Sequence, residues 1–494
     1  MALLENDVAA SPTTGTEKLL PANWVKADDV LGGLAAGKVL DFEITAGNSS
    51  LIRILDHMGI AGPFKVVDPW HLADPEGVVR INAGGYSASP LGDRPPVLVD
   101  FLTRYLREGT SMGLPQQSAG DWRAALEHNL IALLASRAPS HADSQVFFSN
   151  SGAEAIESAI KFARAARPKA RYFINFSGAY HGKTLGALSL TPNPTFQDGF
   201  QPLALDAITL PFGDLDRLEM VIERTGADRI AAIVVEPIQG EAGVIVPPQD
   251  FLKGLGALAQ KHGILTIADE IQTGLGRTGY WFASIEWGGM DPDIITLAKA
   301  LGGGLVPVAA TIARKPIYKA LLGGSHSKRH SNTFGGNSLG MAVGLKSLDI
   351  IASEGLVERA RTMGERGKRR LADIAARYPR IFAGTRGFGM LMAAQFQPVL
   401  SVPALLGRRP RVGELTGLVG LMMWHRAGVQ ANLSLNAARV IRLTPALNMP
   451  EAVFDEMFKR IEQAANEHRG AWKMLTRTPA RRLAAIGKFA ATGK

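Results

Sequence analysis

The sequence predicts an α/β fold built on a doubly wound, mainly parallel sheet. Apolar runs of strand length alternate with helical periodicity, most clearly at 230–235, 250–262 and 264–269, which is the pattern of βαβ units. At 494 residues the chain exceeds the size at which one hydrophobic core stops growing, so more than one domain is expected. A composition of 46% hydrophobic and 20% charged residues is typical of globular proteins and excludes wholesale disorder.

The elements divide into four predicted segments. Residues 85–344 form a large domain with the parallel sheet, and residues 45–84 combine with 345–470 in a smaller α+β domain. An N-terminal extension, 1–44, precedes them and a basic tail, 471–494, follows.

Two stretches of the small domain need their own interpretation. Residues 387–392, rich in glycine, are expected to start a strand rather than to form a dinucleotide loop, because no helical pattern follows them. Residues 397–414 contain several prolines and arginines and are expected to form a surface loop.

The positive charge is concentrated at the C-terminus. Residues 469–494 contain four arginines and three lysines and no acid, which is +7 of the +9 carried by the whole chain, so the rest carries only +2. A nearly neutral body argues against a nucleic-acid-binding groove. Residues 480–489 have the pattern of a short amphipathic helix. Such a helix could rest on an anionic membrane or an acidic partner; the alternative is a tail that is disordered or docked on another subunit.

The composition and the N-terminal residues indicate where in the cell the protein is expected. The chain has no cysteine, which excludes a disulfide framework and a thiolate nucleophile. It has no run of about 18 apolar residues, so no membrane span is expected. Glu5 and Asp7 precede any apolar run, which argues against a signal peptide. We expect a cytoplasmic protein without a metal site.

Polar groups follow two of the predicted strands. After the apolar strand that ends near Phe148, the residues Ser151, Gly152 and Ala153 start a helix, where free backbone N–H groups and a hydroxyl suit a phosphate. Asp269 ends the strand 264–269 and is expected to face the ligand crevice of the sheet. There it would keep a pyridine nitrogen protonated, with an attraction on the order of 4 kcal/mol at about 4 Å.

Lys299 stands between an apolar run, 294–298, and three glycines, 302–304. Burial of an ammonium group costs several kcal/mol, so a lysine here is expected to be neutral or covalently used, unless only its stem is buried and its head reaches water. A phosphate cradle, a ring-nitrogen acid and a lysine, each at a strand end, together describe a pyridoxal phosphate site.

Seven motifs in order along the chain carry a resemblance to a known family. They are Ser149–Glu154, Gly178–Thr184, Val235–Glu241, Asp269–Gly274, Gly276–Gly279, Ala298–Gly303 and His330–Asn337. On these motifs the chain resembles the class III aminotransferases of the fold type I pyridoxal phosphate enzymes. The resemblance covers roughly residues 80–345 and continues more faintly to about 465.

The resemblance implies a role for each matched residue at the cofactor ring. Lys299 would hold the cofactor covalently and, once released, act as the base that moves a proton from the substrate carbon, which requires a pKa well below the usual value of about 10.4. Asp269 would pair with the ring nitrogen and Gln272 would reach the phenolic oxygen. Tyr180 would stack on one face of the ring and Ile271 would pack against the other.

The resemblance also implies how the phosphate is held. Ser151, Gly152 and Ala153 would bind it within one subunit, and Thr333 would reach the phosphate of the neighbouring subunit, which implies a homodimer with two shared sites. Without their flanking motifs, Tyr180 and Thr333 would be interpreted as ordinary turn packing.

Substrate recognition is expected at three further positions. The resemblance implies that Glu241 pairs with Arg442 and that the opened pair frees the arginine to clamp the carboxylate of a dicarboxylic acceptor such as 2-oxoglutarate; a permanent structural salt bridge is the alternative. Lys183 stands where many ornithine and 4-aminobutyrate aminotransferases have an arginine that grips the donor's carboxylate. The putrescine aminotransferases resemble this chain at that position.

The predicted reaction is transfer of the terminal amino group of a diamine or ω-amino acid, of the putrescine or ornithine type, to a 2-oxo acid in two half-reactions. A racemase or aminomutase on the same fold is an alternative, because some relatives keep every cofactor contact. A non-catalytic scaffold is a third possibility, which the intact Lys299, Asp269 and Tyr180 argue against.

Overall fold

The structure is a computed structural model that describes Pro21, residues 23–109, 118–398 and 412–468, and Lys473, Ala480 and Ala484. Most of the predicted surface loop and nearly all of the basic tail, with its predicted amphipathic helix, lie outside the described residues.

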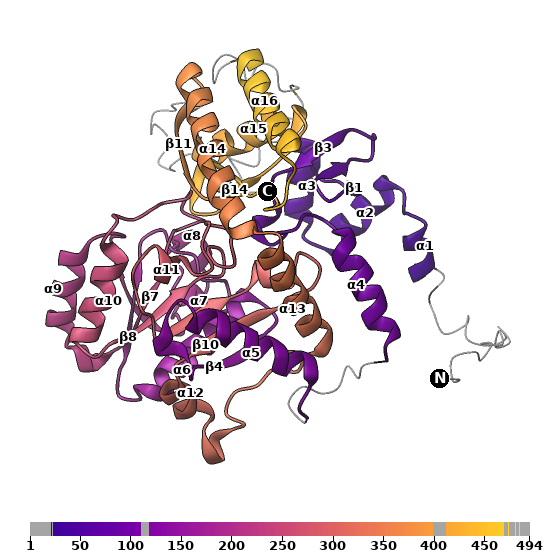
Figure 1. Cartoon of the computed structure of the whole chain (residues 1–494). Coiled ribbons are helices and arrows are strands. Elements are labelled where there is room, and N and C mark those ends of the chain that lie inside the picture. The colour runs from indigo at the N-terminus through magenta and orange to yellow at the C-terminus, as the bar shows by residue number, and fades with distance from the viewer. Residues whose placement is uncertain are drawn as a thin grey trace, which may run out of the picture.

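A seven-stranded sheet forms the centre of the molecule, with the strand order β4-β10-β9-β8-β7-β5-β6 (Figure 1). Strand β10 is antiparallel to both of its neighbours, whereas β9, β8, β7, β5 and β6 run parallel. The strands are β4 (Gln145–Ser149), β5 (Tyr172–Phe176), β6 (Asp206–Leu210), β7 (Ile230–Val235), β8 (Leu265–Asp269), β9 (Ile294–Leu297) and β10 (Ala309–Ala313). The predicted α/β class with a mainly parallel sheet is confirmed.

Helices cover both faces of this sheet. Strand β7 is buried at all six positions; Ala232 and Val234 belong to one hydrophobic cluster and Ile233 and Val235 to another. The first cluster includes α6 (Gly152–Ala166) and α12 (Lys315–Leu322); the second includes α5 (Asp121–Ala135), α9 (Leu215–Thr225), α10 (Phe251–Lys261) and α13 (Ser338–Ser353). Burial on both faces explains why the strands are continuous apolar runs in the sequence. The three elements predicted at 230–269 are β7, α10 and β8.

Two smaller four-stranded sheets have the orders β1-β2-β3-β13 and β11-β12-β15-β14. Their strands are β1 (Lys65–Asp68), β2 (His71–Ala73), β3 (Val79–Asn82), β11 (Phe382–Phe388), β12 (Leu391–Phe396), β13 (Val429–Gln430), β14 (Asn432–Ser434) and β15 (Ala437–Leu443). The stretch predicted to start a strand at 387–392 spans a hairpin turn: β11 ends at Phe388, Gly389 adopts a φ of 57°, and the new strand starts only at Leu391.

The remaining long helices pack on these smaller sheets. Helix α14 (Leu356–Arg377) lies on β11, and α15 (Val412–Arg426) lies on β15 beside α16 (Glu451–His468). Figure 1 shows α14, α15 and α16 together at the top of the molecule, apart from α9 and α10. Parallel pairing of β3 with β13 joins the N-terminal and C-terminal segments in one sheet. The predicted domain boundaries stay a prediction.

Shorter elements complete the chain. They are α1 (Ala27–Leu31), α2 (Ala36–Ala46), α3 (Ser49–Met58), α4 (Pro96–Arg107), α7 (Leu185–Ser189), α8 (Pro194–Gln197), α11 (Ala283–Glu286) and the 3₁₀ turns at Gly85–Ser87, Pro139–His141, Ala227–Arg229, Lys299–Gly302 and Gly324–His326. Within the described residues, no helix has both the length and the apolar character needed to cross a bilayer.

Candidate active site

A cavity of about 460 Å³ opens at the edge of the sheet where β4, β5, β7, β8 and β9 end. Because parallel strands deliver their carboxyl ends to one edge, segments that are distant in sequence meet there. Ten of the predicted site residues line it, namely Ser151, Gly152, Ala153, Tyr180, Lys183, Glu241, Asp269, Ile271, Gln272 and Lys299.

The turn after β4 forms the N-terminus of α6. The Ser151 hydroxyl accepts the backbone N–H of Glu154 at 3.2 Å, and the Glu154 carboxylate accepts the N–H groups of Asn150 and Ser151 at 2.7 and 3.1 Å. This capping box uses the N–H of Ser151, which the sequence had suggested would be free. The structure records no acceptor within the described chain for the N–H groups of Gly152 and Ala153, so these two remain for an anion.

Asp269 is almost completely buried, at 4% exposure, and lies beside a histidine. Nδ1 of His181 lies 2.7 Å from Oδ2 of Asp269, while the other carboxylate oxygen accepts the N–H of Ile271 at 3.1 Å. Burial by itself lowers the pKa of His181, but the hydrogen bond and charge of Asp269 outweigh it and raise the pKa above its usual value. Asp269 and His181 therefore form a buried pair at the cavity wall.

Lys299 occupies a strained position directly after β9. Its φ is 44°, in the left-handed region that residues other than glycine seldom adopt, and its side chain lines the cavity. It forms no recorded hydrogen bond or ion pair with a described residue. Burial lowers the pKa of the Lys299 ammonium, against the opposing charges of Glu241 and Asp269. The amine is thus uncommitted and easier to deprotonate than an exposed lysine.

Close packing shapes the wall on either side of Asp269. A Cβ atom on Gly240 would lie 1.6 Å from Oε1 of Gln272, and one on Gly152 would lie 3.0 Å from Cδ1 of Ile271. Gly240 is therefore required for Gln272 to take its observed place, and a side chain in place of Gly152 would crowd Ile271.

Glu241 and Arg442 form a closed ion pair. Oε1 of Glu241 lies 2.6 Å from Nη2 of Arg442, and Oε2 accepts the N–H of Leu435 at 3.0 Å. Arg442 is fully buried, yet its Nε and Nη1 atoms have no hydrogen-bond partner within the described chain. A buried guanidinium with two unused donors is an unfavourable arrangement that an incoming carboxylate can relieve.

Lys183 and Thr333 differ from the other predicted residues. The Lys183 ammonium lies 4.0 Å from the centre of the Phe196 ring, which is itself edge-on to Tyr180 at 6.5 Å. Thr333 is exposed and does not line the cavity of its own chain. Asn332 ties the Thr333 loop to β4 by donating to the carbonyl oxygen of Phe148 at 3.0 Å.

Two buried residues of the cavity were assigned no role from the sequence. His181 partners Asp269, and Glu236 accepts the backbone N–H of Tyr180 at 2.9 Å. Both stand inside quoted motifs, but motif membership does not reveal which acid a histidine contacts. Asn150 and the segment 304–308, which also line the cavity, carried no chemical signal in the sequence.

The residues present fit pyridoxal phosphate. Unused N–H groups at the start of a 15-residue helix suit a phosphate, and a buried carboxylate paired with a histidine suits a pyridinium nitrogen. An uncommitted amine with a lowered pKa suits covalent attachment. The cavity volume lies within the range of cofactor pockets, about 300–1,000 Å³.

The comparison with protein families points to the same chemistry. The family described as aminotransferase class-III matches residues 70–465, which is most of the chain. Members of this family depend on pyridoxal phosphate.

Solved structures agree in fold. Ornithine aminotransferase from Toxoplasma gondii is 26% identical, with a TM-score of 0.72 over 83% of this chain and 91% of its own. An amine transaminase from an uncultivated Pseudomonas species with pyridoxal phosphate bound is 26% identical, with a TM-score of 0.72 over 82% and 94%. Acetylornithine aminotransferase from Elizabethkingia anophelis is 28% identical, with a TM-score of 0.66 over 82% and 93%. The fold type I prediction is confirmed by these matches.

Proposed function

The chain belongs to the class III aminotransferase family, and we propose that within it the protein transfers the terminal amino group of a diamine or ω-amino acid to a 2-oxo acid. The observation that carries this proposal is the meeting of Lys299, Asp269 and the α6 N-terminus at one cavity, next to a closed Glu241–Arg442 pair. A pair that can open suits an enzyme that binds two dissimilar substrates in turn, as transamination requires.

We propose that Lys299 binds the cofactor, that Asp269 pairs with its ring nitrogen, and that Gly152 and Ala153 bind its phosphate together with the Ser151 hydroxyl. Tyr180 and Ile271 would lie on opposite faces of the ring and Gln272 at its phenolic oxygen. When bound, pyridoxal phosphate supplies an electron sink for the negative charge that develops at the substrate carbon.

The chain's own contribution to the reaction is proton movement and exclusion of water. Lys299, with its lowered pKa, is proposed to take the proton from the substrate carbon once its nitrogen is free. The His181–Asp269 pair keeps a negative charge where the ring nitrogen would lie, so that this nitrogen stays protonated. Capping by Glu154 and the β4 turn keeps the phosphate end rigid.

Arg442 is proposed to bind the acceptor. With Glu241 displaced, the guanidinium would offer two parallel N–H donors to the distal carboxylate of 2-oxoglutarate, and its unused Nε and Nη1 already lie unpaired. A diamine donor such as putrescine carries no carboxylate, so with it the pair would stay closed in the first half-reaction. This alternation supports a ping-pong cycle and disfavours a one-substrate racemase or aminomutase.

The proposed donor is of the putrescine or ornithine type. The Lys183 ammonium rests on the Phe196 ring rather than pointing freely into the cavity, so it is a poor carboxylate clamp.

A cytoplasmic homodimer is part of the proposal. Exposed Thr333 would bind the phosphate held by the partner subunit, and the adjacent Phe334, 68% exposed, would be covered in the dimer.

The test is the visible absorbance of the holoenzyme with each substrate in turn. Putrescine added without an oxo acid should remove the visible band, and 2-oxoglutarate should restore it. If the band persists with putrescine but disappears with ornithine or 4-aminobutyrate, the donor is that amino acid and not the diamine. Exchange of the substrate's carbon-bound hydrogen with solvent, without any loss of the band or need for an oxo acid, would contradict transamination.

A further inference from the structure

Beside the effect of burial, four charged groups act on the pKa of Lys299: the three acids Glu241, Asp269 and Glu236 raise it, and Arg442 lowers it. Two of these acids are compensated by a cation: Glu241 by Arg442 at 2.6 Å, and Asp269 by His181 at 2.7 Å. Glu236 takes part in no recorded ion pair with the described residues. Of the three acids, Glu236 is therefore the one whose charge is not matched by a recorded ion pair within the described chain.

Glu236 is fixed in place by the protein rather than by a ligand. It follows the last residue of β7, is 6% exposed, and lines the cavity. Its Oε1 atom accepts the N–H of Tyr180, which holds the carboxyl beside the loop that carries Tyr180 and His181. A neutral N–H donor anchors the side chain without cancelling its charge.

Burial raises the pKa of Glu236 to about 7, against the lowering effect of the neighbouring His181 and of the Tyr180 N–H; Asp269 raises it further, and Lys299 lowers it. The carboxyl therefore changes charge within the physiological range. That charge acts on two groups of the site, because it raises the pKa values of both His181 and Lys299.

One ring nitrogen of His181 has no hydrogen-bond partner within the described chain. Its Nδ1 is engaged with Asp269, but its Nε2 is buried and has no hydrogen-bond partner within the described chain. Burial lowers the pKa of His181, and Asp269 and Glu236 raise it, with no further recorded contact at Nε2 within the described chain.

We propose that Glu236 is a positioning residue of the transamination site that acts through Lys299: its ionised carboxylate holds up the proton affinity of Lys299, and its protonation lowers it. The inference rests on the proposed attachment of the cofactor to Lys299.

The experiment is a pH titration of the visible absorbance of the holoenzyme, which reports protonation at the Lys299 nitrogen. Glu236→Gln keeps the shape and an oxygen that can accept the Tyr180 N–H, but removes the charge. We expect its midpoint to lie about 1 pH unit below that of the wild type, a typical effect of removing one nearby charge. The acid limb of the kcat profile should move in the same direction, and Glu236→Asp, which keeps the charge, should restore the wild-type midpoint.

Glu270→Gln is the matched control. Burial raises the pKa of Glu270 to about 7 as well, but its carboxylate accepts the N–H and hydroxyl of Ser284 at 2.6 and 2.7 Å and does not line the cavity. Its titration midpoint should match the wild type within about 0.2 unit. A shift as large as that of Glu236→Gln would show a general effect of buried charge and overturn the specific role.

Two further results decide the proposal. A cofactor-loaded Glu236→Gln protein with an unshifted midpoint would overturn it. If that variant does not fold, the wild-type titration still tests the idea: two coupled protonations are expected between about pH 6 and 9, and a single-proton curve would contradict them. Absence of a visible band that depends on Lys299 in the wild type would instead contradict the proposed function itself.

Discussion

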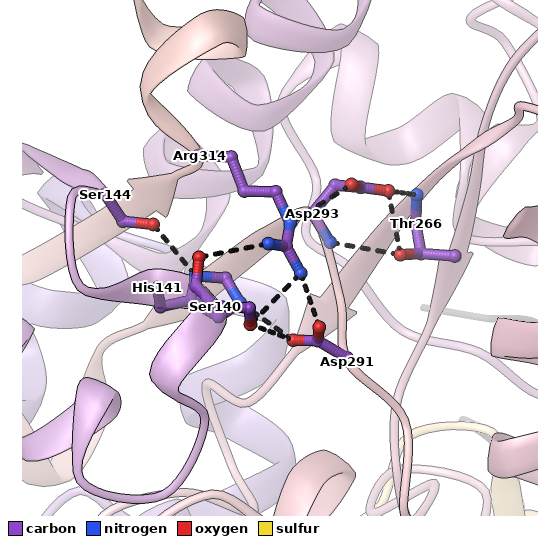
Figure 2. Close-up of polar contacts among 7 residues, drawn as sticks. All are labelled: Ser140, His141, Ser144, Thr266, Asp291, Asp293 and Arg314. Atoms are coloured by element: carbon purple, nitrogen blue, oxygen red, sulfur yellow. Dashed lines mark hydrogen bonds and ion pairs between the residues drawn. The ribbon is translucent and has the colours of Figure 1, made fainter.

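The two edges of the seven-stranded sheet differ in whether their charged side chains are paired with one another. Figure 2 shows the amino edge, where Ser140, His141, Ser144, Thr266, Asp291, Asp293 and Arg314 form what we name the amino-end cluster. Arg314 lies 2.8 Å from Asp291 and 3.3 Å from Asp293. Asp293 also accepts the N–H of Thr266 at 2.9 Å, and Asp291 accepts the Ser140 hydroxyl at 2.9 Å. Each charged group here has a partner within the cluster.

The carboxyl edge leaves several polar groups without one. Among the described residues, Lys299 has no recorded partner, His181 and Arg442 each have nitrogens without a hydrogen-bond partner, and Glu236 has no recorded ion pair. The backbone at Lys299 is strained as well, whereas the described residues of the amino-end cluster include none with positive φ.

The difference teaches which charged groups serve stability and which await a ligand. Charges that compensate one another within the chain stabilise it modestly, while uncompensated charges cost stability and persist where a ligand completes them. Substitutions at the two edges should therefore separate activity from stability.

The largest expected effect is at the carboxyl edge. Lys299→Ala should abolish the visible cofactor band and lower kcat by at least about 10³-fold, because attachment and proton transfer are both lost. The thermal midpoint of the cofactor-free variant should not fall, since a poorly solvated amine is removed. Lys315→Ala, an exposed lysine at the amino edge, is the control and should leave activity unchanged. If Lys299→Ala lowered the thermal midpoint but kept the visible band, the proposed difference between the two edges would be contradicted.

Arg442→Lys should have the next largest effect. A lysine keeps the charge opposite Glu241 but loses the guanidinium fork, so kcat/KM for 2-oxoglutarate should fall about 10- to 100-fold. The amine half-reaction, measured by stopped-flow absorbance, should change by less than about 3-fold. Equal losses in both half-reactions would identify the pair as a permanent salt bridge.

At the amino edge, Arg314→Met should lower the free energy of unfolding of the holoenzyme by about 1 kcal/mol, because two carboxylates lose their cation in a partly exposed site. Activity per bound cofactor should stay within about 2-fold. Arg171→Met, which breaks an exposed pair with Asp206 at the sheet edge, is the control and should be nearly silent in denaturant titration. Loss of activity in Arg314→Met at unchanged stability would contradict the division between the edges.

The smallest expected effect concerns His141. Burial, together with the charge of Arg314, lowers the pKa of this histidine below its ordinary 6.5. The unfolded chain therefore binds the proton first, and stability falls as the pH drops below about 6.5. In His141→Asn the difference in unfolding free energy between pH 7.5 and 5.5 should be smaller by on the order of 1 kcal/mol.

Exposed His326→Asn provides the comparison for that measurement. Urea titrations of the three proteins at both pH values test it. An unchanged pH dependence in His141→Asn would show that His141 is not the titrating group.

Local patterns predicted the elements well and the contacts poorly. The helix expected at 250–262 is observed at Phe251–Lys261. It was predicted correctly because apolar periodicity is a local feature of the sequence. The hairpin turn at Gly389 was interpreted as a strand start, since a glycine's positive φ has no sequence signature of its own. The capping box of Ser151 and Glu154 was readable from the sequence and explains why the Ser151 N–H is not free.

The sequence by itself determined the fold class, the family and the residue types at each strand end, because burial and periodicity act over a few neighbouring positions. Only the tertiary structure decided that His181 pairs with Asp269, that Glu241 and Arg442 are closed on one another, and that Glu236 forms no ion pair with any described residue. Charges interact through distance in space and not along the chain, so the proton affinities of this site exist only once the sheet has brought its strand ends together.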